Sequence, residues 1–178
     1  RDSATCRLHA SAACSRTPLR LSIPIMQDPT NMLVRVQNLS KEYRRGQTLV
    51  SALQDVTLDV KAGEFCAFVG PSGCGKSTLL NLIGGLDQPT SGTIAIESRP
   101  VTYASATEWT RLRRELIGIV FQAFHLIPGL TVAENVALPL LLKGERGAAV
   151  AERVNEVLEA VRMDRRRSHR PGELSGGE

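Results

Sequence analysis

The sequence is most constrained by one glycine-rich segment, residues 70–78, which reads Gly-Pro-Ser-Gly-Cys-Gly-Lys-Ser-Thr and fits the pattern G-x-x-x-x-G-K-[ST]. In such a loop, successive backbone N–H groups converge on a phosphate group, and glycines let the chain come close because they have no Cβ. The loop then opens into a helix, whose positive N-terminal end favours an anion. The segment therefore predicts a loop that binds nucleotide phosphates, placed between a strand and a helix.

The residues on both sides of this loop agree with that interpretation. The apolar run Glu64–Val69 suits a buried strand, and Leu79–Ile83 continues as a helix. Lys76 would reach the β- and γ-phosphates and is a predicted catalytic residue, and the Ser77 hydroxyl would coordinate Mg²⁺. The predicted phosphate site consists of Gly70, Pro71, Ser72, Gly73, Cys74, Gly75, Lys76, Ser77 and Thr78. A chance match of the four fixed positions is expected in about one chain of this length in a hundred.

Composition and charge limit the other possibilities. With 178 residues, of which 42% are hydrophobic, the chain has the size of one domain with a real core. The longest apolar stretch, Leu138–Leu142, is far shorter than the ~20 residues of a membrane-spanning helix, so a membrane role would require a partner. The net charge of +4 arises from basic residues near the N-terminus and between Arg162 and Arg170. Because no aromatic residues are interleaved with the second basic run, we interpret it as a solvated loop rather than a nucleic-acid surface.

Two further features bear on the compartment. The cysteines at positions 6, 14, 66 and 74 show no metal-ligand spacing. Cys66 falls in a predicted buried strand and Cys74 in the loop, so reduced, cytoplasmic thiols are expected.

Residues 1–31 are rich in Ser, Ala and Arg without a regular period, which predicts a disordered leader or sequence translated upstream of a start at Met26 or Met32. An organelle transit peptide is the alternative.

From Met32 onward the hydrophobic pattern becomes regular. Apolar runs predict strands over residues 33–39, 56–60, 93–96 and 117–121. Two capping boxes, Ser105–Glu108 and Thr131–Glu134, predict helices, the first through Glu115 and the second interrupted by Pro139. An apolar stripe at helical spacing then predicts a packed helix, and it consists of Val150, Val154, Val157, Leu158 and Val161.

Three more segments carry a family resemblance: residues 121–128 (Phe-Gln-Ala-Phe-His-Leu-Ile-Pro), 130–136 (Leu-Thr-Val-Ala-Glu-Asn-Val) and 169–178, which end in Leu-Ser-Gly-Gly-Glu. With the phosphate loop, they make the chain from Leu33 to its last residue resemble the nucleotide-binding subunit of a bacterial ATP-binding-cassette (ABC) transporter. The branch that it resembles serves lipoprotein release, macrolide efflux and antimicrobial-peptide export. Glu178, where other branches usually have Gln, is typical of that group.

The resemblance implies a fold and a division into domains. The fold is α/β, a P-loop NTPase of the ABC ATPase type, with an N-terminal antiparallel β subdomain and a helical subdomain. Residues 32–178 are expected to form a partial nucleotide-binding domain. Its ATP-core portion is expected at about 32–121, and the Q-loop with the helical subdomain at about 122–178.

The resemblance also implies roles for single residues, with ATP and Mg²⁺ as cofactors. Tyr43 is expected to stack on adenine, with ordinary packing as the alternative. Gln122 matches the Q-loop glutamine, which contacts Mg²⁺ or water near the γ-phosphate, so it is expected to be a catalytic and metal-binding residue. A buried structural amide is the alternative. The following segment, Ala123–Leu142, resembles the surface that receives a membrane permease subunit. His125 is expected to be a surface residue.

The last motif would act in a second subunit. In the family, two domains pair head to tail, and the signature of each caps the ATP held by the other. The signature residues are Leu174, Ser175, Gly176, Gly177 and Glu178. Ser175 would supply a hydroxyl, and the glycines would expose backbone N–H groups to the γ-phosphate. The expected location is the cytoplasm, peripheral to the cytoplasmic face of the inner membrane through the permease.

After the signature, the family has a strand ending in Asp-Glu and then a switch histidine, and the printed chain ends before both. We therefore expect an incomplete core sheet, marginal stability and no hydrolysis for this chain alone. Two other readings stay open. One is a non-catalytic or decayed fragment, and the other is a soluble ABC ATPase of DNA repair or translation. The transported substrate cannot be read from the sequence.

Overall fold

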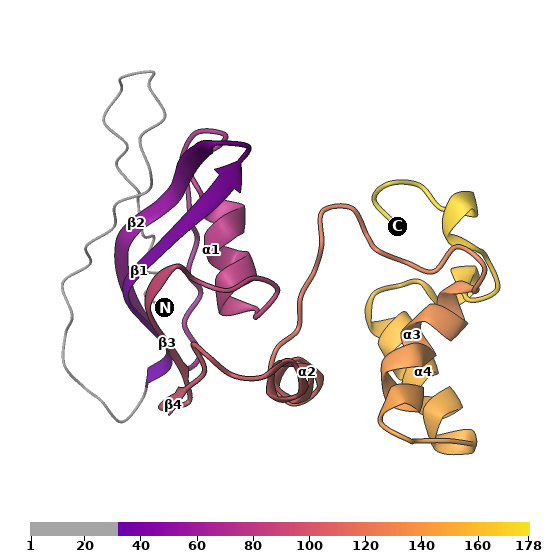
Figure 1. Ribbon diagram of the computed structural model, residues 1–178. Coiled ribbons are helices and arrows are strands. Elements are labelled where there is room, and N and C mark those ends of the chain that lie inside the picture. Colours follow the sequence, from indigo (N-terminus) through magenta and orange to yellow (C-terminus); the bar gives the residue numbers. More distant parts are fainter. Residues whose placement is uncertain (1–31) are drawn as a thin grey trace. The chain divides into compact units, whose positions relative to one another are not determined.

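A computed structural model describes residues 32–178, so the leader expected at 1–31 lies outside the described residues (Figure 1). The chain divides into two compact units between Arg113 and Arg114. Among residues 32–178, no helix has both the length and the apolar character that crossing a membrane requires.

The first unit is built on an antiparallel sheet. Its strands are β1 (Met32–Arg45), β2 (Thr48–Lys61), β3 (Ser91–Ile96) and β4 (Arg99–Pro100), in the order β2-β1-β3-β4. All three neighbouring pairs are antiparallel. The predicted strands at 33–39, 56–60 and 93–96 lie within β1, β2 and β3, so the expected antiparallel β subdomain is confirmed.

One helix packs with the sheet and carries the phosphate loop at its start. Helix α1 (Lys76–Ile83) buries Leu79 and Leu82, which lie three positions apart on one face. The sheet contributes further fully or almost fully buried side chains: Val36, Leu39, Leu53, Val56, Leu58 and Ile94. Because Leu79 and Leu82 belong to this apolar core, the core holds helix α1, and with it the end of the phosphate loop, in place against the sheet.

Helix α2 (Ala106–Glu115) begins at the predicted capping box. The Ser105 backbone N–H donates to Glu108 Oε2 over 2.7 Å, and the Glu108 N–H donates to Ser105 Oγ over 3.2 Å. Trp109, on the buried face of α2, lies so close to Gly85 that any Cβ there would collide with the indole ring. Gly85 also has a φ of +65°, a conformation that residues with a side chain rarely adopt. Both the backbone conformation and the close indole ring therefore favour glycine at this position.

The second unit is helical (Figure 1). It contains α3 (Val132–Leu142), α4 (Ala148–Ala160) and two short 3₁₀ helices, η2 (Asp164–Arg166) and η3 (Pro171–Glu173). The capping box Thr131–Glu134 is confirmed at the start of α3. The predicted interruption at Pro139 is wrong. Helix α3 continues through it to Leu142. The proline removes only the hydrogen bond that its own missing N–H would donate, and the turn after it stays bonded, since the Lys143 N–H donates to the prolyl carbonyl over 3.2 Å.

Helices α3 and α4 share a small core. It consists of Val132, Val150, Val154 and Leu158. The predicted apolar stripe therefore packs with three of its five residues, whereas Val157 and Val161 are 36% and 61% exposed.

Two predicted strands are wrong. Residues 64–68 and 117–121 have no strand structure, and Val69 makes only an isolated bridge. Phe65 is 77% exposed and Val120 is fully exposed. A buried parallel strand needs hydrogen-bonded neighbours and layers on both faces. The described residues provide no such setting for either segment, so an apolar run alone does not become a strand. The described sheet is antiparallel throughout.

Candidate functional site

The phosphate loop, Gly70–Thr78, has the backbone shape that its glycines allow. Gly73 and Gly75 have φ angles of +80° and +98°. A Cβ at Gly75 would collide with the Ala52 carbonyl oxygen and would lie 2.8 Å from Cδ2 of Leu53. Only glycine therefore lets the loop lie against β2 at this point.

The Lys76 ammonium folds back onto the loop. Its Nζ donates to the carbonyl oxygens of Gly70 and Pro71 over 2.9 and 2.7 Å, and it lies 3.5 Å from Sγ of Cys74. These two carbonyls hold the Lys76 ammonium against the loop, where a phosphate group bound by the loop could accept hydrogen bonds from it. Ser77, the next residue, is exposed.

The start of α1 is also suited to an anion. Its first turn contains no acidic residue, and Gly75 at the N-cap offers no side chain to the free backbone N–H groups. The partial positive charge of the helix end is therefore not neutralised from within α1. Together with the Lys76 ammonium, this geometry fits a bound phosphate and, at the Ser77 hydroxyl, a metal ion that accompanies it.

Tyr43 lies in a network that the sequence did not reveal. Its hydroxyl donates to Asp87 Oδ2 over 2.8 Å, and Lys41 Nζ donates to Asp87 Oδ1 over 2.7 Å. The same ammonium lies 4.8 Å from the centre of the Tyr43 ring. Asp87 was missed because only the pairing of β1 with β3, for example Ser40 with Ser91, brings these distant residues together.

The network changes the pKa of both partners. Partial burial, and then the hydrogen bond to Asp87, raise the pKa of Tyr43 above its ordinary value. Partial burial opposes the ionisation of Asp87, but the hydrogen bonds from Lys41 and Tyr43 outweigh it and lower the pKa of this carboxyl. Tyr43 is therefore a neutral hydroxyl donor to a carboxylate at neutral pH.

The signature residues form a tight turn in the second unit. We call Ser175–Glu178 the signature turn. Glu178 Oε2 accepts hydrogen bonds from both the N–H and the hydroxyl of Ser175, over 2.9 and 2.8 Å. Glu178 Oε1 accepts from Nε of Arg166 over 2.8 Å. Mainly because of the bonds from Ser175, and then the one from Arg166, the pKa of Glu178 is lowered to about 2.

Arg166 was missed at the sequence level, where the basic run was interpreted as solvated. Its ion pair with Glu178 shows that at least this arginine has a specific partner. The SxxE spacing of Ser175 and Glu178 is that of a capping box and could have revealed this local pair, but not its arginine partner.

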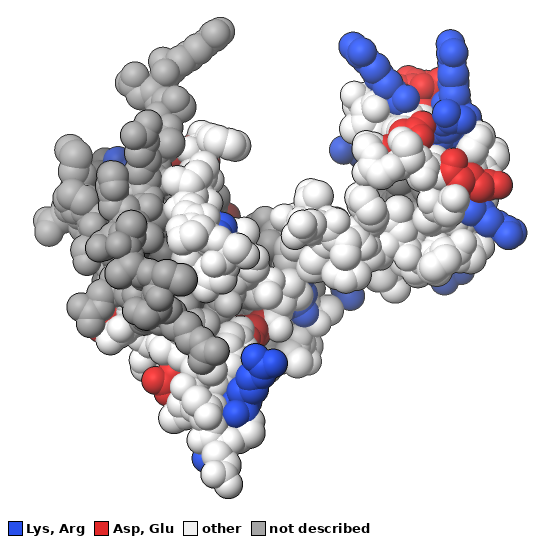
Figure 2. Space-filling view, turned by 90° about the horizontal axis from the view of Figure 1, so that it is seen from above, with Lys and Arg blue, Asp and Glu red and all other residues white. Residues whose placement is uncertain are grey.

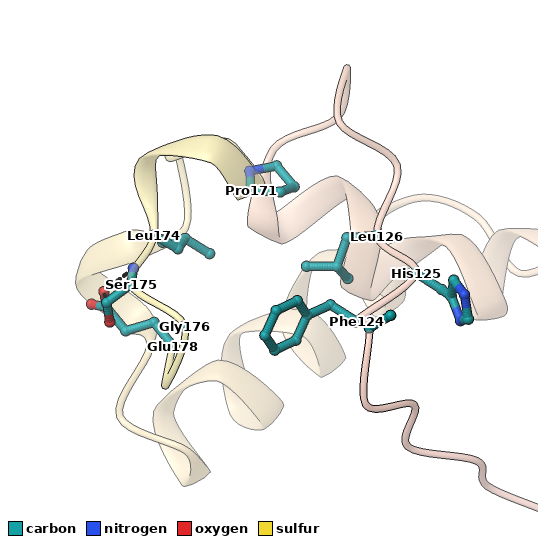
Figure 3. A pocket seen from close by; sticks show the side chains of 9 residues that line it. Phe124, His125, Leu126, Pro171, Leu174, Ser175, Gly176 and Glu178 are labelled. Atoms are coloured by element: carbon teal, nitrogen blue, oxygen red, sulfur yellow. Dashed lines mark hydrogen bonds between the residues drawn. The ribbon is translucent and has the colours of Figure 1, made fainter.

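A pocket of about 390 Å³ lies beside the signature turn. Its lining residues are Ala123, Phe124, His125, Leu126, Pro171, Leu174, Ser175, Gly176 and Glu178. Figure 3 shows Phe124 and Leu126 facing Leu174, whereas His125 turns away from them. The second unit thus brings the residues that follow Gln122 together with the signature.

Gln122, which directly precedes the pocket-lining residue Ala123, is exposed. Phe124 and His125 have φ angles of +58° and +52°, which are uncommon for residues with a side chain. The His125 ring packs edge-on against Phe121, with 4.5 Å between the ring centres, and stays exposed. This backbone is locally strained just after Gln122, at the start of the segment that the resemblance assigns to a permease.

The predicted site residues thus form two groups. Tyr43 and the phosphate loop lie in the first unit, and Gln122 and the signature lie in the second. A protein-family model described as "ABC transporter" matches residues 53–178, which include the phosphate loop, Gln122 and the signature turn. The chain belongs to the ABC transporter family.

Solved ABC cassettes resemble the chain over most of its length. One is described as the dimeric structure of a post-hydrolysis state of the ATP-binding cassette MJ0796 bound to ADP and Pi. It is 44% identical, with a TM-score of 0.76, and the match covers 82% of this chain and 64% of that one. A second, described as the dimeric structure of MJ0796, a bacterial ABC transporter cassette, is 43% identical, with a TM-score of 0.75 and the same coverage. This ABC chain therefore spans less than two thirds of the cassettes that it matches.

The viewed face of the second unit of this ABC chain carries charges of both signs (Figure 2). Figure 2 shows Lys and Arg side chains alternating with Asp and Glu on the viewed face of the second unit, with no continuous basic patch. The ion pairs Arg153–Glu156 and Arg166–Glu178 belong to this unit.

Proposed function

We propose that this chain is part of the ATP-binding subunit of an ABC transporter, and that the complete protein hydrolyses MgATP to power transport through a separate membrane subunit. The observation that carries the proposal is the phosphate loop. Its two left-handed glycines, the Lys76 ammonium on the loop carbonyls and the uncapped start of α1 lie within one short segment, and all three favour an anion.

The nucleotide would be held by residues of the first unit. The backbone of Gly70–Thr78 and the Lys76 ammonium would bind the phosphates, the Ser77 hydroxyl would bind Mg²⁺, and the Tyr43 ring would stack on adenine. Asp87 supports this role of Tyr43 by holding its hydroxyl. When bound, Mg²⁺ neutralises charge on the phosphates during hydrolysis.

Residues of the second unit would complete the site. Gln122 would orient Mg²⁺ or water, and the signature residues Leu174–Glu178 would cap a nucleotide held by a second copy. The dimeric state described for both MJ0796 structures supports this pairing. The division that we propose is an ATP-core portion at 32–121 and a helical portion, including the Q-loop, at 122–178.

A membrane partner would dock on residues 122–142. Large apolar side chains in this segment are exposed: Phe124, Leu126, Ile127, Leu141 and Leu142. An exposed apolar group of this kind is typical of a protein interface. The chain would then be peripheral on the cytoplasmic face of the membrane, held there by the permease.

Nucleotide binding tests the proposal. The protein as its gene encodes it is titrated with MgATP in a calorimeter, alongside Lys76→Ala and the control Lys61→Ala, which removes an exposed lysine from the end of β2. Loss of a charge-assisted contact to phosphate should weaken binding by roughly ten- to a hundredfold in Lys76→Ala. Lys61→Ala should bind normally. Absence of MgATP binding to the unchanged protein, or equal binding by Lys76→Ala, would overturn the proposal.

A further inference from the structure

The signature turn carries a full negative charge beside its key hydroxyl. Glu178 Oε2 lies 2.8 Å from Oγ of Ser175, and the lowered pKa of Glu178, about 2, keeps the carboxyl ionised at neutral pH. A phosphate oxygen that bonds to the Ser175 hydroxyl would therefore lie within about 5.5 Å of this carboxylate oxygen. Without a counter-charge, such an arrangement is repulsive.

Arg166 supplies the counter-charge. Its Nε donates to Glu178 Oε1 over 2.8 Å, and its Nη1 lies 3.3 Å from Nε2 of His169. Each oxygen of the Glu178 carboxylate therefore has its own partner: Oε1 accepts from Arg166, and Oε2 accepts from Ser175. If the Ser175 hydroxyl turned to a phosphate, the carboxylate would still be held by Arg166 and by the Ser175 N–H.

The position of Arg166 is fixed by helix α3. The first N–H groups of α3 have no acceptor within the helix. Those of Ala133 and Val132 donate instead to the carbonyl oxygens of Arg167 and His169, which follow Arg166 on the same short segment, over 3.0 and 2.8 Å. The segment that carries Arg166 therefore caps the first turn of α3. This anchoring lets the guanidinium act as a positioned group rather than a mobile surface charge.

We propose that Arg166 is a positioning residue that holds and neutralises Glu178, so that the Ser175 hydroxyl and the neighbouring backbone N–H groups can receive the triphosphate bound by a second copy of the chain. This inference rests on the proposed function. It explains how a glutamate can occupy the last signature position without repelling the nucleotide.

The test measures association driven by nucleotide in the protein as its gene encodes it. Light scattering gives the concentration of a non-hydrolysable ATP analogue, with Mg²⁺, that produces half-maximal dimer. In Arg166→Ala the Glu178 carboxylate loses its counter-charge and repels a phosphate oxygen within about 5.5 Å. We therefore expect this variant to raise the half-maximal analogue concentration by roughly three- to tenfold. The matched control Arg165→Ala, an exposed neighbour in η2, should change it by less than about twofold. Arg166→Lys, which keeps the charge, should lie close to the unchanged protein.

A second substitution separates a charge effect from a structural one. Arg166→Ala with Glu178→Gln should recover most of what Arg166→Ala loses, because the double variant has no unpaired carboxylate beside Ser175. The inference is overturned if Arg166→Ala behaves like Arg165→Ala, or if the double variant stays as impaired as Arg166→Ala. Binding of a fluorescent ATP to the monomer should be unchanged in Arg166→Ala and Arg165→Ala. If the unchanged protein binds no ATP, the proposed function fails, and this inference fails with it.

Discussion

The Tyr43 hydroxyl donates a hydrogen bond to the Asp87 carboxylate over 2.8 Å and so joins the end of β1 to the segment that follows α1. Lys41 strengthens this link, because its ammonium bonds to the same carboxylate and lies over the Tyr43 ring. The ring is thereby held in place before any ligand binds. A preorganised aromatic platform loses little conformational entropy when a base stacks on it.

Removing this platform should weaken ATP binding and leave phosphate binding intact. Stacking on an aromatic ring contributes about 1–3 kcal/mol per base, so Tyr43→Ala should lower the affinity for MgATP by roughly 5- to 100-fold. Tyr43→Phe keeps the ring and should lose much less. Calorimetry with MgATP and with inorganic tripolyphosphate separates the two parts of the site.

Tyr103→Ala is the matched control, because Tyr103 is 83% exposed and should not affect either ligand. Equal losses of ATP and tripolyphosphate affinity in Tyr43→Ala would show that Tyr43 supports the loop rather than the base. No loss at all would leave Tyr43 as an ordinary surface side chain.

The helical unit should depend on the α3–α4 core. Leu158 is 2% exposed, and truncation to alanine leaves a cavity that should lower the free energy of unfolding by about 2–4 kcal/mol. Leu142→Ala removes a side chain that is 66% exposed and should change it by no more than about 0.5 kcal/mol. Urea denaturation followed by circular dichroism measures both. Similar losses in the two variants would contradict the packing described for α4.

Acid should release the signature turn only at very low pH. The pKa of Glu178 is lowered to about 2 from its ordinary value, so its contribution to stability is complete above the ordinary pKa near 4.5 and is lost as the pH falls through about 2. Carbon NMR of the Glu178 carboxyl should follow this titration. In Arg166→Ala the pKa should rise but stay below its ordinary value, because the bonds from Ser175 remain. A midpoint near 4.5 in the unchanged protein would contradict the geometry of the turn.

Local physics made much of this structure predictable. The capping boxes at Ser105 and Thr131 and the glycines of the phosphate loop depend on residues only a few positions apart, and the structure has them as expected. The strands at β1, β2 and β3 also follow their own alternation.

Features that depend on distant residues were missed or wrong. Asp87 reaches Tyr43 only through the pairing of β1 with β3, and Arg166 reaches Glu178 only through the fold of the helical unit. The runs 64–69 and 117–121 look like buried strands, but a strand needs a neighbour that periodicity cannot supply. The assignment of single residues to ATP and Mg²⁺ stays a prediction.

The most direct test of a paired ABC cassette is the mass of the protein with and without a non-hydrolysable ATP analogue and Mg²⁺. We predict that the unchanged protein doubles its mass when the analogue is added. Ser175→Arg should bind the analogue but remain monomeric, whereas the control Ser168→Arg, at an exposed position nearby, should dimerise normally. A protein that binds no analogue, or a Ser175→Arg variant that dimerises as the unchanged protein does, would contradict the nucleotide-bridged pair.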